Sequence, residues 1–184
     1  DNNKNDILNG WDDDLCLNQN WINQAEKLRD ELKSFDEKFD IVITTTLSRA
    51  QKTASIIKEA FDYEVETIID KRFDEQAFWE YKWMKVCDLQ EKYPDLKRNE
   101  LIKIYRNNKV ENLEQFENRV LEAYREISSK YEWKNVLLVS HGWTFRVINK
   151  YLNNLSFDDA YINVSAVWNS KMVKLPNYIK TNNL

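Results

Sequence analysis

The sequence predicts an α/β fold, a three-layer α/β/α sandwich built on a mostly parallel sheet. Short apolar, β-branched segments alternate along the chain with longer segments whose apolar residues recur at helical spacing. Such alternation gives a largely parallel sheet with helices on both faces. The chain has 184 residues, of which 42% are hydrophobic and 32% charged. This composition can bury a core and is unlike that of a disordered chain.

Two helices and two strands are expected in the first part of the chain. Residues 20–35 place apolar side chains at helical spacing with charged residues between them, which predicts a helix. The β-branched run within 39–44 predicts a buried strand. Ser48 is then a suitable N-cap for a helix over 49–61, because its hydroxyl can accept a hydrogen bond from the first helical turn. The apolar residues 65–69 predict a second strand.

The last part of the chain repeats the alternation. Strong helical periodicity predicts a helix over 113–131. Residues 135–140, "NVLLVS", are the clearest buried strand, and a helix over 143–152 follows directly. The alternating segment 166–175 is expected to end the fold as a further strand.

We interpret residues 1–184 as a single domain, because no repeat, low-complexity tract or linker interrupts the chain. Residues 76–112 are expected to form a small helical cap or insertion within it. Most of this segment, 77–105, is aromatic and charged and is predicted to be helical, with Pro94 as a break.

Composition also indicates which kinds of binding partner the protein can have. The net charge of −4 gives no electrostatic footprint for nucleic acid, so an anionic substrate would need a local pocket. The longest apolar runs are far too short to span a bilayer, and no signal peptide is visible. Cys16 and Cys87 lack partners at metal-ligand spacing. Two reduced thiols are typical of a cytosolic protein, so we expect a cytoplasmic location.

Three polar residues follow the predicted strands. Arg49 lies between a strand end and a helix start, Glu75 lies shortly after the second strand, and His141 directly follows the strand "NVLLVS". In sheets of this kind, ligands bind beyond the carboxyl ends of the strands. A helix start favours phosphate, and an arginine can bind phosphate oxygens in a bidentate way. An imidazole can stabilise charge on a phosphoryl oxygen, and a carboxyl group with a raised pKa can protonate a leaving oxygen.

Each of these residues has a common structural alternative when it is taken alone. An arginine that opens a helix is usually a surface residue, and a glutamate after a strand is usually solvated. A lone histidine at a strand end is often a hydrogen-bonded structural residue. The occurrence of all three in matching settings is what indicates a phosphate site.

Five sequence elements in order resemble the histidine phosphatase superfamily, which has the phosphoglycerate-mutase-like fold. Residues 1–32 are similar to the segment that follows the family's N-terminal Arg-His-Gly signature. "ITTTLSRAQKTASII" resembles S-x-L-x-R-A-x-x-T-A, and "RFDEQAF" resembles L-x-E-x-x-F. "VENLEQFENRV" resembles the G-E-S…R-V segment, and "LLVSHGWTFRVI" is similar to V-S-H-G-x-x-x-R. The resemblance covers essentially the whole chain.

The resemblance implies a two-step reaction on a phosphorylated small molecule. The histidine of the Arg-His-Gly motif would take the phosphoryl group, and water would then hydrolyse the phosphohistidine. By the same resemblance, Arg49 would bind the phosphate and His141 would stabilise the transferring group. Glu75 would protonate the leaving alkoxide and then activate water. Asn3 matches the asparagine that the family places beside the phosphate. No metal or other cofactor is implied.

The Arg-His-Gly motif itself is not among the 184 residues, and by the resemblance it would end just before Asp1. Either upstream residues are missing from the chain, or the protein is a relative that lost the nucleophile. The abrupt start within a well-kept pattern favours missing residues. The 184 residues alone are then expected to be inactive, and without the first strand the sheet should expose an apolar edge.

Three functions therefore remain open at this stage. The first is a phosphomonoester hydrolase in its complete form, and the second is a phosphoglycerate mutase. The third is a catalytically inactive phosphatase-like domain that binds phosphorylated ligands or a partner protein. The short stretch between Glu75 and His141 favours the hydrolase, because mutases of the family usually have a longer insertion there.

Overall fold

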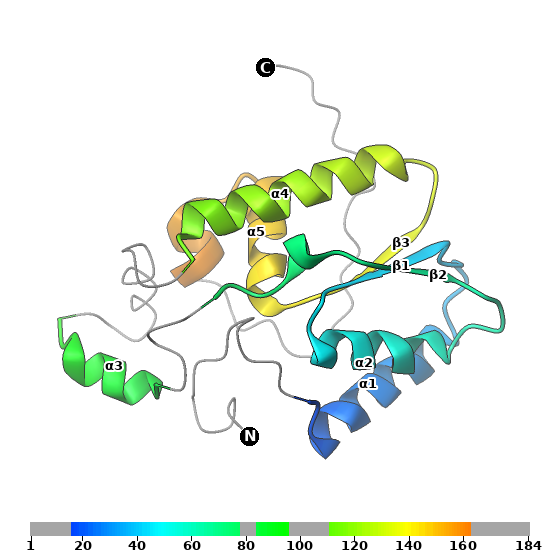
Figure 1. Cartoon of the computed structure of the whole chain (residues 1–184), viewed down its shortest axis with the longest axis horizontal. Helices are drawn as coiled ribbons and strands as arrows, with labels where there is room; N and C mark the ends of the chain where they lie inside the picture. The colour runs from blue at the N-terminus through cyan, green and yellow to red at the C-terminus, as the bar shows by residue number, and fades with distance from the viewer. Residues whose placement is uncertain (1–15, 78–83, 96–110, 163–184) are drawn as a thin grey trace.

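The structure, a computed structural model, describes residues 16–77, 84–95 and 111–162 (Figure 1). Its centre is a parallel sheet in which β1 (Ile41–Thr44) lies between β2 (Glu66–Ile69) and β3 (Val136–Val139). Ile41 is in register with the first residue of each neighbouring strand. All four side chains of β1 are buried. These strands confirm the parallel α/β architecture expected from the alternation of apolar segments.

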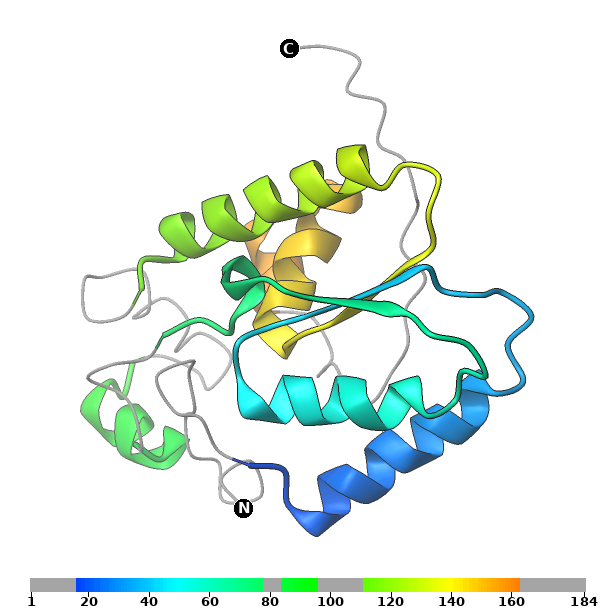
Figure 2. The ribbon, with the colours of Figure 1, turned by 45° about the vertical axis from the view of Figure 1, so that its right-hand side comes forward.

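Two pairs of helices cover the two faces of this sheet. In Figures 1 and 2, α1 (Gln19–Leu32) and α2 (Ser48–Lys58) lie on one face. On the opposite face lie α4 (Leu113–Lys130) and α5 (Gly142–Leu152). The three-layer α/β/α sandwich is therefore confirmed.

The middle strand contributes to two separate cores, because successive side chains of a strand point to opposite faces. Ile41 and Ile43 pack with buried apolar residues of α4 and α5, among them Phe116 and Val120. Val42 packs on the other face with buried residues of α1 and α2. A strand so fully enclosed needs β-branched residues that are mostly apolar, and the sequence "IVIT" provides three apolar residues and one threonine.

The outer edge of β3 is less enclosed. In the described ranges β3 pairs with β1 alone, and three of its four apolar side chains are only half-buried. The fourth, Val139, is buried at the end of the strand that leads to α5. The apolar sheet edge expected from the sequence stays a prediction, as does the single domain over 1–184.

The start of α2 differs from the expectation. Ser48 was the predicted N-cap, but it is the first helical residue, and Leu47 occupies the N-cap position in an extended conformation. The side chain of Leu47 is buried, and its carbonyl group accepts hydrogen bonds from the N–H groups of Ala50 and Gln51. The helix therefore begins at Ser48, one residue before the predicted start, directly after the buried Leu47.

Shorter elements complete the described chain. They are the 3-10 helix η1 (Lys71–Phe73), the helix α3 (Val86–Lys92) and the π-helical turn η4 (Asp158–Ile162). Of the helical segment predicted over 77–105, only α3 falls within the described residues, and it ends just before Pro94. The predicted strand 166–175 lies outside them. None of the described helices is long and apolar enough to cross a membrane.

The core on the α4 face should dominate stability. Phe116 is 0% exposed within that core, whereas Trp133 is 91% exposed in the connection before β3. Phe116→Ala is expected to lower the free energy of unfolding by about 3–5 kcal/mol, because it leaves a cavity. Trp133→Ala should change it by less than about 0.5 kcal/mol. Urea denaturation measures both, and similar losses in the two variants would contradict this description of the core.

Candidate active site

Three of the four predicted site residues lie in the described chain, and the structure brings them to one edge of the sheet. Arg49 is the second residue of α2, which follows β1. His141 directly precedes α5, which follows β3. Glu75 follows β2 and η1. The positive charge of Arg49 acts on both the carboxyl group of Glu75 and the imidazole of His141. Asn3 lies outside the described residues.

The parallel strands explain why this edge suits an anion. Because β1 and β3 are parallel neighbours, α2 and α5 both begin at the carboxyl edge of the sheet. The positive ends of their dipoles therefore face the same region, which favours a phosphate group. In the ranges 16–77, 84–95 and 111–162, no group of three or more His, Cys, Asp or Glu side chains could hold a metal ion.

His141 is held against the end of β1. Its Nε2 atom lies 3.0 Å from the hydroxyl of Thr45, which in turn accepts a hydrogen bond from the N–H of Leu47. Removal from water keeps the pKa of His141 well below its usual range, and the positive charges of Arg49 and Arg119 lower it further. The imidazole is therefore neutral at pH 7 and can offer one N–H to a bound oxygen.

Glu75 is a buried carboxyl group with few hydrogen-bond donors around it. The N–H of Gln76 donates to Oε1 at 3.1 Å, and the N–H of Trp143 lies 3.5 Å from Oε2. Burial raises the pKa of Glu75 to about 7, although these two N–H groups and the charges of Arg49 and Arg119 lower it. Such a carboxyl group can both give and take a proton near neutral pH, which is what general acid–base catalysis requires.

The segment that contains Glu75 is tied to both neighbouring connections. The carbonyl group of Phe73 accepts hydrogen bonds from the hydroxyls of Ser140 (2.8 Å) and Thr144 (3.1 Å). The carboxylate of Asp74 accepts from the N–H of Thr46 (2.8 Å) and from its hydroxyl (2.6 Å). These bonds join the connections after β1, β2 and β3 into one unit.

Sequence reasoning missed these supporting residues. Thr45, Thr46 and Ser140 are hydroxyl side chains at strand ends, and Asp74 directly precedes the predicted acid. All four lie within the sequence elements that resemble the family, within a few residues of Arg49, Glu75 or His141, and this position is the signal that could have pointed to them. Arg119 and Glu111 belong to "VENLEQFENRV", which resembles the family's G-E-S…R-V segment, but the sequence analysis assigned them no role.

The raised pKa of Glu75 has a consequence for stability. The folded chain binds this proton more tightly (pKa about 7) than a free glutamate does (4.5). The resulting stabilisation is full below pH 4.5 and is lost as the pH rises through about 7. Glu75→Gln removes this dependence, so its stability relative to the parent should rise by about 3 kcal/mol across that window. Urea denaturation across the pH range measures the difference, and a pH-independent difference would contradict the raised pKa.

Comparisons with known proteins identify the family of the chain. A family model of the histidine phosphatase superfamily (branch 1) matches residues 1–166. The uncharacterized phosphatase PhoE of Bacillus subtilis (strain 168) is 30% identical over 129 residues, which are 70% of this chain and 60% of PhoE. The phosphoglycerate mutase of Schizosaccharomyces pombe is 29% identical over 165 residues, which are 85% of this chain and 76% of the mutase.

A solved structure confirms the fold independently. Bacillus stearothermophilus YhfR superposes with a TM-score of 0.78 over 92% of this chain and 82% of its own, at 19% sequence identity. At that level of identity the likeness concerns the fold alone. Membership of the family is shown by the family model, which matches most of the chain. The chain therefore belongs to the histidine phosphatase superfamily, branch 1.

Proposed function

We propose that this chain, together with a histidine nucleophile ahead of residue 1, is a phosphomonoester hydrolase that acts through a phosphohistidine. The observation on which the proposal depends is the buried carboxyl group of Glu75, with a pKa of about 7, beside the positive charge of Arg49. His141 is the only histidine among the 184 residues and matches the second histidine of the family. In this proposal the nucleophile is the histidine of an Arg-His-Gly segment.

In the first step, the bond between phosphorus and the ester oxygen breaks as a bond to the nucleophilic imidazole forms. Arg49, His141 and Asn3 would hold the phosphoryl oxygens, the arginine by its charge and the neutral imidazole by an N–H hydrogen bond. Glu75 would give its proton to the leaving alkoxide and become a carboxylate. The products of this step are the free alcohol and the phosphohistidine.

In the second step, water replaces the imidazole on phosphorus. The carboxylate of Glu75 would accept a proton from the attacking water, which restores the acid and releases inorganic phosphate. One residue can serve both steps only if its pKa lies near the working pH. Burial of the Glu75 carboxyl group meets that condition.

The substrate class follows from the same site. We propose a phosphorylated small molecule, because Arg49 and the starts of α2 and α5 place positive charge at the sheet edge while the chain as a whole has a net charge of −4. A cytoplasmic location is proposed as well, since Cys16 and Cys87 are free thiols.

A phosphoglycerate mutase is the alternative enzyme, supported by the likeness to the Schizosaccharomyces pombe mutase. A mutase must keep water away from its phosphohistidine and return the phosphoryl group to a second hydroxyl. Incubation of the complete protein with 3-phosphoglycerate distinguishes the two, because a hydrolase releases inorganic phosphate and a mutase forms 2-phosphoglycerate. An upstream sequence with another residue in place of the nucleophilic histidine would support a third reading, an inactive binding domain.

The phosphohistidine can be trapped directly. The complete protein should take up ³²P from a labelled substrate within one turnover, and a rapid alkaline quench should preserve the label, because phosphorus–nitrogen bonds of this kind survive base. Replacement of the upstream histidine by asparagine should abolish both label and turnover. Turnover without any labelled protein would contradict the covalent mechanism.

Glu75→Gln tests the acid separately. It keeps the shape of the side chain but cannot donate the proton, so kcat on alkyl phosphates should fall by ~100-fold or more. Nitrophenyl phosphates have a leaving group that needs no proton, and their kcat should fall far less. Equal losses on the two esters would show that Glu75 is not the general acid.

A further inference from the structure

Arg119, on α4, uses all five of its N–H donors. Its Nε and Nη2 groups donate to the two carboxylate oxygens of Glu111, with Nη2 2.7 Å from Oε2. Its Nη1 group donates to the carbonyl oxygens of Arg72 (2.8 Å) and Asp74 (2.9 Å). Its Nη2 group also donates to the carbonyl oxygen of Glu75 (3.2 Å). An arginine has five such donors, so the guanidinium is fully satisfied by one carboxylate and three carbonyl groups.

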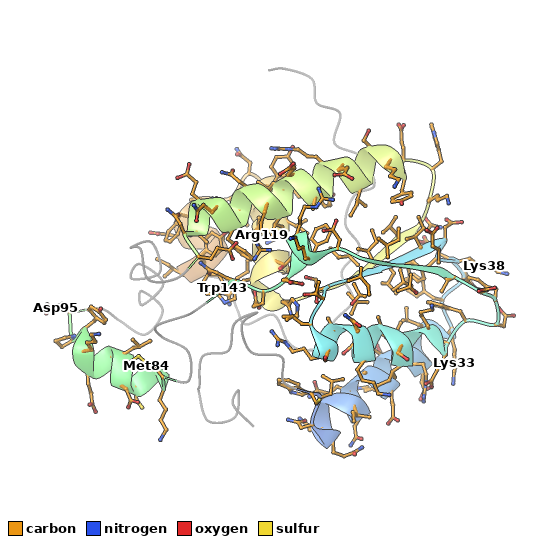
Figure 3. The ribbon with its side chains drawn as sticks, viewed as in Figure 1. Lys33, Lys38, Met84, Asp95, Arg119 and Trp143 are labelled. Carbon is orange, nitrogen blue, oxygen red and sulfur yellow. The ribbon has the colours of Figure 1, made fainter. Side chains whose placement is uncertain are left out.

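The three carbonyl groups belong to the backbone that presents Glu75. They lie in η1 and directly after it, outside the strands, where backbone groups need hydrogen-bond partners other than a neighbouring strand. Figure 3 shows Arg119 between α4 and this segment. On the other side, the carboxyl group of Glu75 meets the N–H groups of Gln76 and Trp143. The backbone of Glu75 is thus held by α4, while its carboxyl group faces the start of α5.

Glu111 connects Arg119 to the base of the segment 76–112. The N–H of Glu111 donates to the carbonyl of Ala77 (3.2 Å), and the N–H of Ala77 lies 3.4 Å from Oε2 of Glu111. The side-chain amide of Gln76, which is 0% exposed, donates to the carbonyl of Glu111 (2.9 Å). Glu111 is therefore hydrogen-bonded to Gln76 and Ala77, the two residues that follow Glu75.

We infer that Arg119 is a positioning residue for Glu75, and that Glu111 holds the Arg119 guanidinium flat against the backbone of the acid. The inference rests on the proposed role of Glu75 as proton donor. A lysine could not replace Arg119, because an ammonium has three donors and no planar fork to bridge a carboxylate and three carbonyl groups. A small displacement of the acid is enough to matter, since an error of about 1 Å in the geometry of a reacting group can cost ~100-fold in rate.

Arg125 offers a matched control on the same helix. Its guanidinium lies 4.9 Å from the ring centre of Tyr151 and 3.4 Å from the Tyr151 hydroxyl. It donates no hydrogen bond to the segment of Glu75. Arg119→Lys and Arg125→Lys therefore make the same chemical change on α4, and only the first should affect Glu75.

The first measurement needs no turnover. Carbon-13 NMR of labelled glutamate follows the titration of the Glu75 carboxyl group in the complete protein, with Glu75→Gln to assign the signal. Arg119→Lys keeps the positive charge but releases the backbone, so water should reach the carboxyl group and its pKa should fall from about 7 toward 4.5. Arg125→Lys should leave it in place. A folded Arg119→Lys protein with an unchanged Glu75 titration would overturn the inference.

The second measurement uses the leaving group of the substrate. Arg119→Lys should lower kcat on an alkyl phosphate by about 10- to 100-fold and on nitrophenyl phosphate by far less, with KM for both nearly unchanged. In a Glu75→Gln background the same change should add no further selective loss, because both substitutions act through one group. Equal losses on the two esters would mean that Arg119 is only structural.

The two measurements separate this inference from the proposed function. A complete parent protein without phosphatase activity would refute the function, while the titration of Glu75 would still test the positioning. Glu111→Gln serves as a second variant if Arg119→Lys does not fold. It keeps one acceptor for Arg119, so the Glu75 pKa should fall by a smaller amount in the same direction. A Glu111→Gln protein with the parent titration would count against the inference.

Discussion

The parallel pairing of β1 with both β2 and β3 is the constraint on which the rest of the structure depends. Three parallel strands release their connections at one edge, so α2, η1 and α5 all begin there. This brings together residues that lie far apart in the sequence, Arg49, Glu75 and His141. The middle strand is enclosed on both faces, so its position cannot shift without disturbing two cores. The site thus lies at the end of a strand that is packed into two cores.

Burial shifts the pKa values of the two titratable groups of the site, Glu75 and His141, in opposite directions. It raises the pKa of Glu75 to about 7 and lowers that of His141 well below its usual range, because it disfavours the charged form of each. At neutral pH the imidazole is uncharged and the carboxyl group is poised between its two forms. The positive charge then comes mainly from arginine, which suits an incoming phosphate dianion.

Much of the fold followed from the sequence, for reasons that are local. The short apolar runs within "IVIT" and "VLLV" predicted strands, of which the first is buried on both faces and the second mostly half-buried, and the helical periodicity of 113–131 reflects one buried face of α4. The start of α2 was misplaced by one residue, because the burial of Leu47 outweighed the capping preference of Ser48. Propensity is local, whereas burial depends on the whole fold.

The supporting part of the site could not be predicted in the same way. Arg49, Glu75 and His141 stand out because each follows a strand. Arg119 lies in a family-like sequence element, but its hydrogen bonds from α4 to the backbone carbonyl groups beside Glu75 could not be inferred from residue types. The tie between Asp74 and Thr46 likewise joins residues that only the fold brings together. A hydrogen bond to a backbone group depends on the path of the chain in the fold, and that path cannot be deduced from the residue types alone.

We propose that this edge of the sheet is a phosphate site in which His141 is partly buried and neutral at pH 7. His141 is the only histidine of the 184 residues, and the complete protein would carry the proposed upstream histidine as well, so a His141→Gln variant assigns the imidazole proton signals of His141 in an NMR spectrum. These signals are followed against pH in the complete protein, with and without inorganic phosphate. The structure predicts no titration near pH 6.5 without phosphate, and a saturable shift with a raised pKa when phosphate binds. A histidine that titrates near 6.5 and ignores phosphate would contradict it.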